Sequence, residues 1–308
     1  MVCKSVVFPR TRPMLELLTD YTVQLVVLSS AVTGATSGAL GCFAYLRRQS
    51  LVGDVISHSS ILGIVGFFWL WFVLTGDGNK SLWLLIPGAM VASIAAMILT
   101  QWITNSTKIK ADASLGVMLA IFFGTGLTLL RWIQRSSNPI PGQAGLEDYL
   151  FGMAAATTLS DFWMIGILTV VSSVCLFVCW YRLKLLTFDP GYAAGLGLSV
   201  GRWELLLLSL LVIGIVIGLQ IAGVVLMVAL LIAPASAARQ WTNSLGKMIL
   251  LAGLLGGGCA ASGAFMSAVR KGLPTGPAIV VCLTLVVLVS VLFAPGRGVL
   301  SRRRTLVT

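Results

Sequence analysis

The chain has 308 residues, of which 57% are hydrophobic and 10% are charged, with a mean hydropathy of +0.98 and a formal net charge of +11. A water-soluble globular domain does not have this composition, so the sequence predicts an integral membrane protein. The Lys and Arg residues stand in short clusters between apolar runs and form no extended basic face, which argues against a nucleic-acid partner.

Apolar windows long enough to cross a bilayer as helices recur from Tyr21 almost to the C-terminus. They predict an all-α fold, a polytopic transmembrane helical bundle of about eight spans. The predicted spans are 21–46, 54–75, 82–104, 114–133, 160–181, 204–236, 247–268 and 277–294. The transmembrane domain is expected at 21–296, between an N-terminal segment at 1–20 and a basic tail at 297–308.

The 204–236 run is longer than one perpendicular helix needs. It is therefore expected to be tilted, to extend beyond the membrane, or to be broken near Gly218 or Gly223. Three pairs of glycines with G-x-x-x-G spacing indicate close packing between helices in lipid. They are Gly34 with Gly38, Gly214 with Gly218, and Gly253 with Gly257.

If successive loops alternate sides, the positive charges divide unequally. One side holds Arg47, Arg48, Lys108, Lys110, Arg182, Lys184, Arg202, Arg270 and Lys271. The other side holds Lys80, Arg131, Arg135, Arg239 and Lys247. The first side is therefore expected to be cytoplasmic. The basic termini fall on the second side in this arrangement, so a ninth span or a re-entrant segment is an alternative.

The non-spanning segment 134–160 carries Glu147 and Asp148, and an external cap with a short helix around Leu146 to Met153 is expected there. The two acids either attract cations or belong to a solvated loop, and a solvated loop is the more common case.

Asp54 and His58 stand four residues apart in the stretch GDVISHSS, and His58 is the single histidine of the chain. On a helix the two side chains project from the same face. One oxygen and one nitrogen donor suit manganese, iron or zinc, and ionisable residues in a membrane segment usually face a bundle interior or an aqueous cavity. A hydrogen-bonded structural pair, or a carboxylate near a helix start, explains the spacing equally well.

The segment TFDPGYAAGLGLSVGRWE, residues 187–204, lies between two predicted spans. Asp189 followed by Pro190 is a helix-start signal, because the carboxylate accepts from free N–H groups and proline tolerates the first turn. Gly195 and Gly197 then offer a stop. A short helix is expected here, in a place where a transporter could receive force from a soluble motor. The stretches 224–241 and 272–280 contain no nucleophile beside a base, and the single histidine excludes a histidine-pair metalloprotease motif, so no catalytic residues are expected.

The stretch Ser50 to His58, SLVGDVISH, resembles the signature of the membrane permease subunits of manganese, zinc and iron ABC importers. Later stretches resemble further elements of that family in the same order. They are Leu150 to Gly152, Phe188 to Gly197, Val224 to Arg239, Leu273 to Val280, and Leu292 to Gly298. The resemblance runs from about Tyr21 to Gly298.

The resemblance implies a permease of the vitamin-B12-importer type in the bacterial inner membrane. Its expected partners are a cytoplasmic ABC ATPase, a solute-binding protein and a second permease subunit, and it binds no permanent cofactor besides the transported manganese, zinc or iron. By the same resemblance Asp54 and His58 contact the metal. The residues expected to couple to the ATPase are Phe188, Asp189, Pro190, Tyr192, Ala193, Gly195 and Gly197.

Two departures from the family pattern bear on the metal. Arg270, Lys271 and Gly272 stand where the family often has an acidic residue, so a further carboxylate ligand is missing there. Ser59-Ser60 and Leu62-Gly63 replace a stretch that usually contains proline. The alternative function is an ion-coupled secondary metal transporter, which would not need the short helix after Asp189.

Overall fold

The fold is described from a computed structural model, which places residues 20–47, 50–78, 81–135, 140–147, 152, 157–269, 273–295 and 298. The described residues form helices and no strands. The helices are α2 (Tyr21–Leu46), α3 (Ser50–Thr75), α4 (Leu82–Ser106), α5 (Ala111–Gln134), the 3-10 helix η1 (Gln143–Gly145), α7 (Leu159–Val178), α8 (Trp180–Phe188), α9 (Pro190–Gly195), α10 (Val200–Trp241), α11 (Leu245–Val269) and α12 (Thr275–Phe293). Eight segments of the described part are long and apolar enough to span a membrane, which confirms the predicted bundle.

Local sequence accounts for where several helices begin. The Asp20 side chain accepts a hydrogen bond from Thr22 N at 3.0 Å and caps α2. Thr158 and Asp161 form a reciprocal capping box at the start of α7. These caps satisfy backbone N–H groups that have no partner inside the first turn of a helix.

Small residues bring α2 into close antiparallel contact with α11 and with the first half of α10. A Cβ built on Gly34 would lie 2.6 Å from Ala260 Cβ, and one built on Gly38 would lie 2.6 Å from the Ala252 carbonyl oxygen. Ser37 Oγ donates to the Gly214 carbonyl oxygen at 3.0 Å across the α2–α10 contact. These contacts confirm the predicted role of the G-x-x-x-G pairs in helix packing. In lipid the hydrophobic effect does not drive helices together, so their association depends on such close contact.

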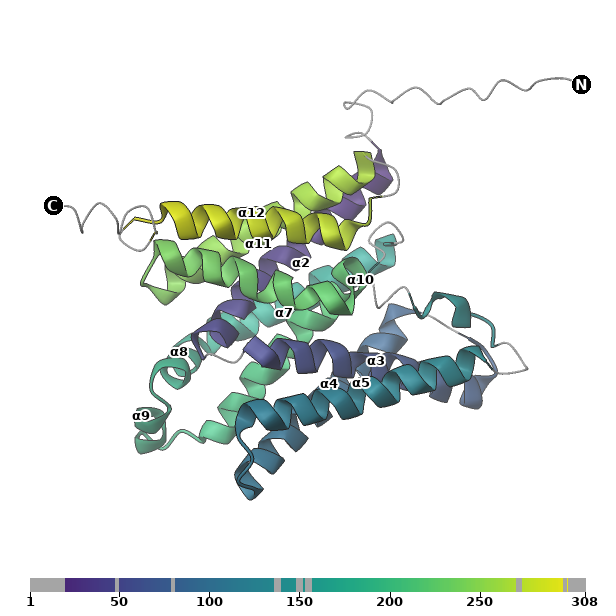
Figure 1. Cartoon of the computed structure of the whole chain (residues 1–308), viewed down its shortest axis with the longest axis horizontal. Coiled ribbons are helices and arrows are strands. Elements are labelled where there is room, and N and C mark those ends of the chain that lie inside the picture. The colour runs from purple at the N-terminus through teal and green to yellow at the C-terminus, as the bar shows by residue number, and fades with distance from the viewer. Residues whose placement is uncertain are drawn as a thin grey trace, which may run out of the picture.

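A second group of helices consists of α3, α4 and α5 (Figure 1). Ser93 of α4 donates to the Ile56 carbonyl oxygen of α3 at 3.0 Å, and Ser59 Oγ donates to Ser93 Oγ at 3.3 Å. A Cβ on Gly63 would lie 2.8 Å from Ala89 Cα, so these two helices also touch through small residues. The helix α10 joins the two groups, because it contacts α2, α3, α4, α7, α11 and α12.

The helix α10 is broken at Gly223, where φ is +75° and ψ is 166°. A Cβ on Gly218 would collide with Met227 Sδ, although nine positions of straight helix separate residues by about 13 Å. The second half of α10 therefore folds back along the first, and in Figure 1 the two green halves run in opposite directions. Of the alternatives for the 204–236 run, the break near Gly223 is the observed one.

Because α10 reverses, the loop at 242–244 lies at the same end of the bundle as α8. A Cβ on Gly246 would lie 3.8 Å from Trp180 Cζ2. Cys42 Sγ, near the end of α2, is 3.7 Å from the Met248 carbonyl oxygen. Trp241 Nε1 donates to Ser290 Oγ at 3.1 Å, so α12 also ends at this side. We call this side, where α2, α4, α8, α10 and α12 end, the coupling end.

The predicted strict alternation of loops is therefore wrong after α10. Arg239 and Lys247 stand at the coupling end and not opposite it. Among the described cationic residues, the coupling end has Arg47, Lys108, Lys110, Arg182, Lys184, Arg202, Arg239 and Lys247. The other end has Arg131 and Arg135. Of these ten described cations, the sequence-based division placed six on the first side and four on the other, so the reversal enlarges the asymmetry within this set. The division differed because a hydrophobic run that contains a return was counted as one span.

Two further boundaries differ from the prediction. The span expected at 160–181 ends at Val178, and a separate nine-residue helix, α8, follows Cys179. In the segment 134–160 the structure contains η1 at 143–145, and most of the short helix expected around Leu146 to Met153 falls outside the described residues, as does Asp148. Glu147 accepts from Arg131 Nη1 at 2.7 Å. This ion pair accounts for the acid without a bound metal cation.

Candidate functional site

Asp54 and His58 lie on one stripe of α3 that the other described helices cover only in part. Both side chains are half-buried, whereas Val55, Ile56 and Ser57 between them are fully buried. The stripe continues through Leu51 on one side and through Leu62 and Gly66 on the other. A Cβ on Gly66 would meet nothing within 4 Å. The prediction that the pair shares one helix face is confirmed, and α5 covers part of that face.

The His58 ring is held in a defined orientation. Its Nδ1 lies 2.9 Å from the Asp54 carbonyl oxygen and 3.3 Å from Ser57 Oγ. A carbonyl oxygen only accepts, so the contact with Asp54 requires the proton on Nδ1 and leaves the lone pair on Nε2. Phe123 of α5 packs against the ring edge-to-face with centroids 4.7 Å apart. These contacts orient Nε2 as a potential metal ligand, in the way that outer contacts fix ligating histidines.

One copy of the chain supplies only part of a metal shell. In the described part of the chain no group of three or more His, Cys, Asp or Glu side chains converges on one point. Asp54 and His58 offer one carboxylate and one imidazole, whereas zinc takes four ligands and manganese commonly six. If the pair binds a metal, it is a half-site whose remaining ligands must come from water or from another molecule.

The short helix after Asp189 forms as the local sequence predicts. Asp189 accepts from Tyr192 N at 2.8 Å, and Pro190 occupies the first turn of α9. The helix ends at Gly195, and Gly197 follows with φ of +78°. Glycine is needed at Gly197 because positive φ is costly for residues that carry a Cβ.

The segment from Phe188, the last residue of α8, through α9 to Leu196 combines one buried anchor with an exposed surface. Ala193 is 1% exposed, whereas Phe188, Tyr192 and Leu196 are 55%, 59% and 58% exposed. The helix lies at the lower-left edge of the bundle (Figure 1), at the coupling end. Large exposed aromatic and aliphatic groups at the tip of a membrane bundle are typical of a protein-binding surface.

The sequence did not predict an ion pair that joins the end of α2 to the start of α10. Arg47, which caps the C-terminus of α2, donates to Glu204 Oε1 at 2.6 Å near the start of α10. The two side chains are 13% and 25% exposed. Their separation in the sequence gives no periodic signal by which the pair could have been found.

The described residues cover only some of the motif positions. Gly152 is described, whereas Leu150, Phe151, Arg270, Lys271 and Gly272 are outside the described residues. Val224 to Arg239 forms the returning half of α10, and Leu273 to Val280 leads into α12.

Known proteins resemble the chain over nearly its whole length. The model of the ABC 3 transport family matches residues 19–294. The zinc transport system membrane protein TroC of Treponema pallidum is 42% identical over 287 residues, which are 93% of this chain and 94% of that protein. The manganese transport system membrane protein MntC of Bacillus subtilis is 40% identical over 280 residues, which are 91% of this chain and 62% of that protein.

Among solved structures, PsaBC from Streptococcus pneumoniae in complex with Fab matches with a TM-score of 0.81 and 27% identity. The match covers 96% of this chain and 99% of the PsaBC chain. The expected type of protein, a multi-pass membrane permease subunit without catalytic activity of its own, agrees with these matches. The motifs, the helical fold and the match over residues 19–294 together show that the chain belongs to the ABC 3 transport family.

Proposed function

We propose that the chain is the permease subunit of an ATP-driven importer of a divalent transition metal, zinc or manganese, in the bacterial inner membrane. The observation that carries this proposal is the Asp54 and His58 pair on a partly exposed stripe of α3, with the His58 ring oriented by its Nδ1 contact at 2.9 Å. The names of the two relatives, a zinc and a manganese transport protein, support the metal class.

The half-site is completed, in this proposal, by a second permease subunit. Two copies that face each other through the α3 stripe would bring two carboxylates and two imidazoles together. This set suits zinc with four ligands, or manganese when water fills further positions. The adjoining face of α5 could admit such a neighbour, because a Cβ on Gly116 or Gly124 would meet nothing within 4 Å.

A separate cytoplasmic ATPase is proposed to dock on α9. The exposed Phe188, Tyr192 and Leu196 offer its contact surface, and the Asp189 cap with Pro190 gives a rigid helix that can transmit force. The eight described cations at the coupling end support its placement in the cytoplasm. A solute-binding protein would then deliver the metal at the opposite end.

The metal role is tested by uptake of radiolabelled zinc and manganese by Asp54→Asn and His58→Gln variants, normalised to the amount of permease in the membrane. Loss of a ligand should lower uptake by at least about tenfold at unchanged abundance. Leu51→Ala is the matched control, because Leu51 lies on the same stripe, is 42% exposed and offers no ligand. Uptake at the wild-type level by both ligand variants would refute the site.

The energy source is tested in proteoliposomes that contain the permease with its ATPase. Uptake should stop when ATP is omitted and should not respond to an imposed proton or sodium gradient. Uptake that is driven by such a gradient without ATP would identify the rival, an ion-coupled secondary transporter.

A further inference from the structure

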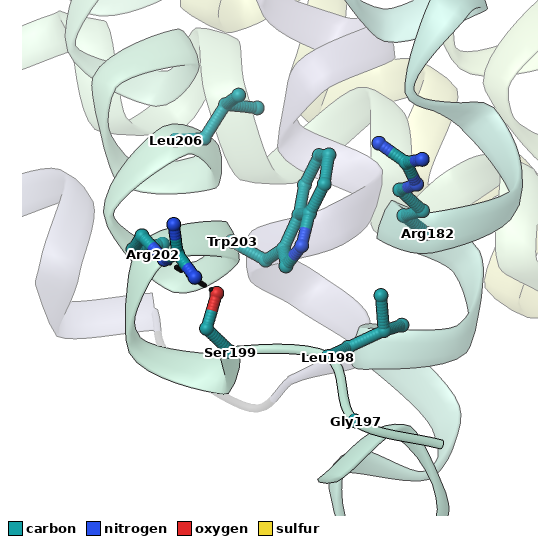
Figure 2. A pocket seen from close by; sticks show the side chains of 7 residues that line it. All are labelled: Arg182, Gly197, Leu198, Ser199, Arg202, Trp203 and Leu206. Carbon is teal, nitrogen blue, oxygen red and sulfur yellow. Dashed lines mark hydrogen bonds between the residues drawn. The ribbon is translucent and has the colours of Figure 1, made fainter.

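A pocket of about 360 Å³ lies at the coupling end between α8 and the start of α10. Its wall is made by Arg182 of α8, by Leu198 and Ser199 of the connecting loop, and by Arg202, Trp203 and Leu206 of α10. Figure 2 shows the two arginines on opposite sides of the Trp203 ring. The pocket is distinct from the Asp54 and His58 pair and from the exposed tip of α9.

The two arginine side chains are held by their neighbours and face no acidic side chain of the pocket wall. Arg182 Cζ stands 4.8 Å from the centre of the Trp203 ring. Arg202 Nε donates to Ser199 Oγ at 2.7 Å, which leaves its two terminal nitrogens for a ligand. The neighbouring carboxylates are engaged elsewhere, since Glu204 pairs with Arg47 and Asp189 caps α9. The pocket therefore has an uncompensated positive charge.

The position of the pocket fits the headgroup region of a bilayer. Leu206 and Trp203 extend from it into the spanning part of α10, whereas Gly197 and the end of α9 lie on its other side (Figure 2). Just before Arg182 in the chain, Phe177, Val178 and Tyr181 are 82%, 76% and 83% exposed and form an apolar surface suited to acyl chains. Arginine is the preferred partner of phosphate groups, and tryptophan is enriched at membrane interfaces.

We propose that this pocket binds the phosphate headgroup of an anionic phospholipid from the leaflet at the coupling end. Basic pockets between transmembrane helices on the cytoplasmic side bind such headgroups. A bound lipid would bridge α8 and α10, the two helices on either side of α9. An acidic segment of the ATPase is the less favoured occupant, because the exposed surface of α9 lies beyond the pocket and not in its wall.

The proposal is tested by native mass spectrometry of the full-length, delipidated permease titrated with phosphatidylglycerol or phosphatidylcholine. The wild type should bind one phosphatidylglycerol at least about tenfold more tightly than phosphatidylcholine, because two cations contact its phosphate. The Arg182→Gln and Arg202→Gln double variant should lose this preference. The matched control is Lys108→Gln with Lys110→Gln, which removes the same charge at the same end but outside the pocket.

Four results would overturn the proposal. An unchanged phosphatidylglycerol preference in the double arginine variant would show that the pocket is not the site, and an equal loss in the lysine control would show a general effect of surface charge. Displacement of the lipid by inorganic phosphate would identify a site for free phosphate. Lost assembly with the ATPase, with lipid binding unchanged, would assign the arginines to the ATPase contact.

Discussion

Gly152, in the chain between α5 and α7, lies directly against the break of α10 at Gly223. A Cβ built on Gly152 would lie 2.6 Å from the Gly223 nitrogen and 2.6 Å from the Ala222 carbonyl carbon. Both glycines have positive φ, +79° for Gly152 and +75° for Gly223. The Gly152 backbone thus packs where α10 reverses, and neither position tolerates a larger residue.

We therefore expect Gly152→Ala to destabilise the permease by about 2–4 kcal/mol, from the strained φ and from the collision with α10. The thermal unfolding midpoint of the purified protein and the folded yield should both fall. Gly166→Ala is the control, because Gly166 lies in α7 and a Cβ there would meet nothing within 4 Å. Equal stability of the two variants would contradict the packing of Gly152 against the break.

The ion pair between Arg47 and Glu204 should contribute more to stability than the pair between Arg131 and Glu147. Glu204→Gln would leave a half-buried guanidinium without its counter-charge, and Arg47 Nη1 has no hydrogen-bond partner among the described residues. We expect a loss of about 1–3 kcal/mol. The Arg131 and Glu147 side chains are 66% and 45% exposed, so Glu147→Gln should change stability by less than about 1 kcal/mol. Chemical unfolding of both variants in one detergent makes the comparison, and the reverse order would contradict it.

The reversal of α10 predicts the membrane side of three positions. In a chain cleared of reactive cysteines, Ser199→Cys and Lys247→Cys should both resist an impermeant thiol reagent in intact cells, because both lie at the proposed cytoplasmic end. Asp77→Cys, which follows the opposite end of α3, should be labelled readily. Labelling of Lys247→Cys but not of Ser199→Cys would mean that α10 crosses the membrane without turning back.

Two adjacent alanines of α9 separate coupling from folding. Ala194 is exposed, so Ala194→Arg should leave the permease folded but abolish the stimulation of the ATPase by metal-loaded binding protein. Ala193 is 1% exposed, so Ala193→Leu should overpack its site and lower stability by about 1–3 kcal/mol. Stimulated ATP hydrolysis and the unfolding midpoint are measured for both variants. Undiminished stimulation in Ala194→Arg would place the ATPase contact outside α9.

Features that depend on neighbouring residues were predictable from the sequence. Hydrophobic length marks the spans, because each must cross the same apolar layer. The cap by Asp189 and the turn at Gly197 depend only on backbone groups a few residues away in the sequence. Both could therefore be predicted from the residue types at these positions. The shared face of Asp54 and His58 follows from the helical repeat, although the half-site needs the family resemblance to be interpreted as a metal site.

Features that join distant parts of the chain were decided only by the tertiary structure. The sequence predicted a break of the long helix near Gly218 or Gly223. That the second half of α10 turns back along the first depends on contacts with α2 and with Gly152. The His58 face of α3 stays partly exposed because the other helices cover it only in part, and the Arg47 and Glu204 pair spans 157 positions. Such contacts depend on how whole helices fit together, and a linear pattern of hydrophobic residues specifies which segments are helical but not which faces meet.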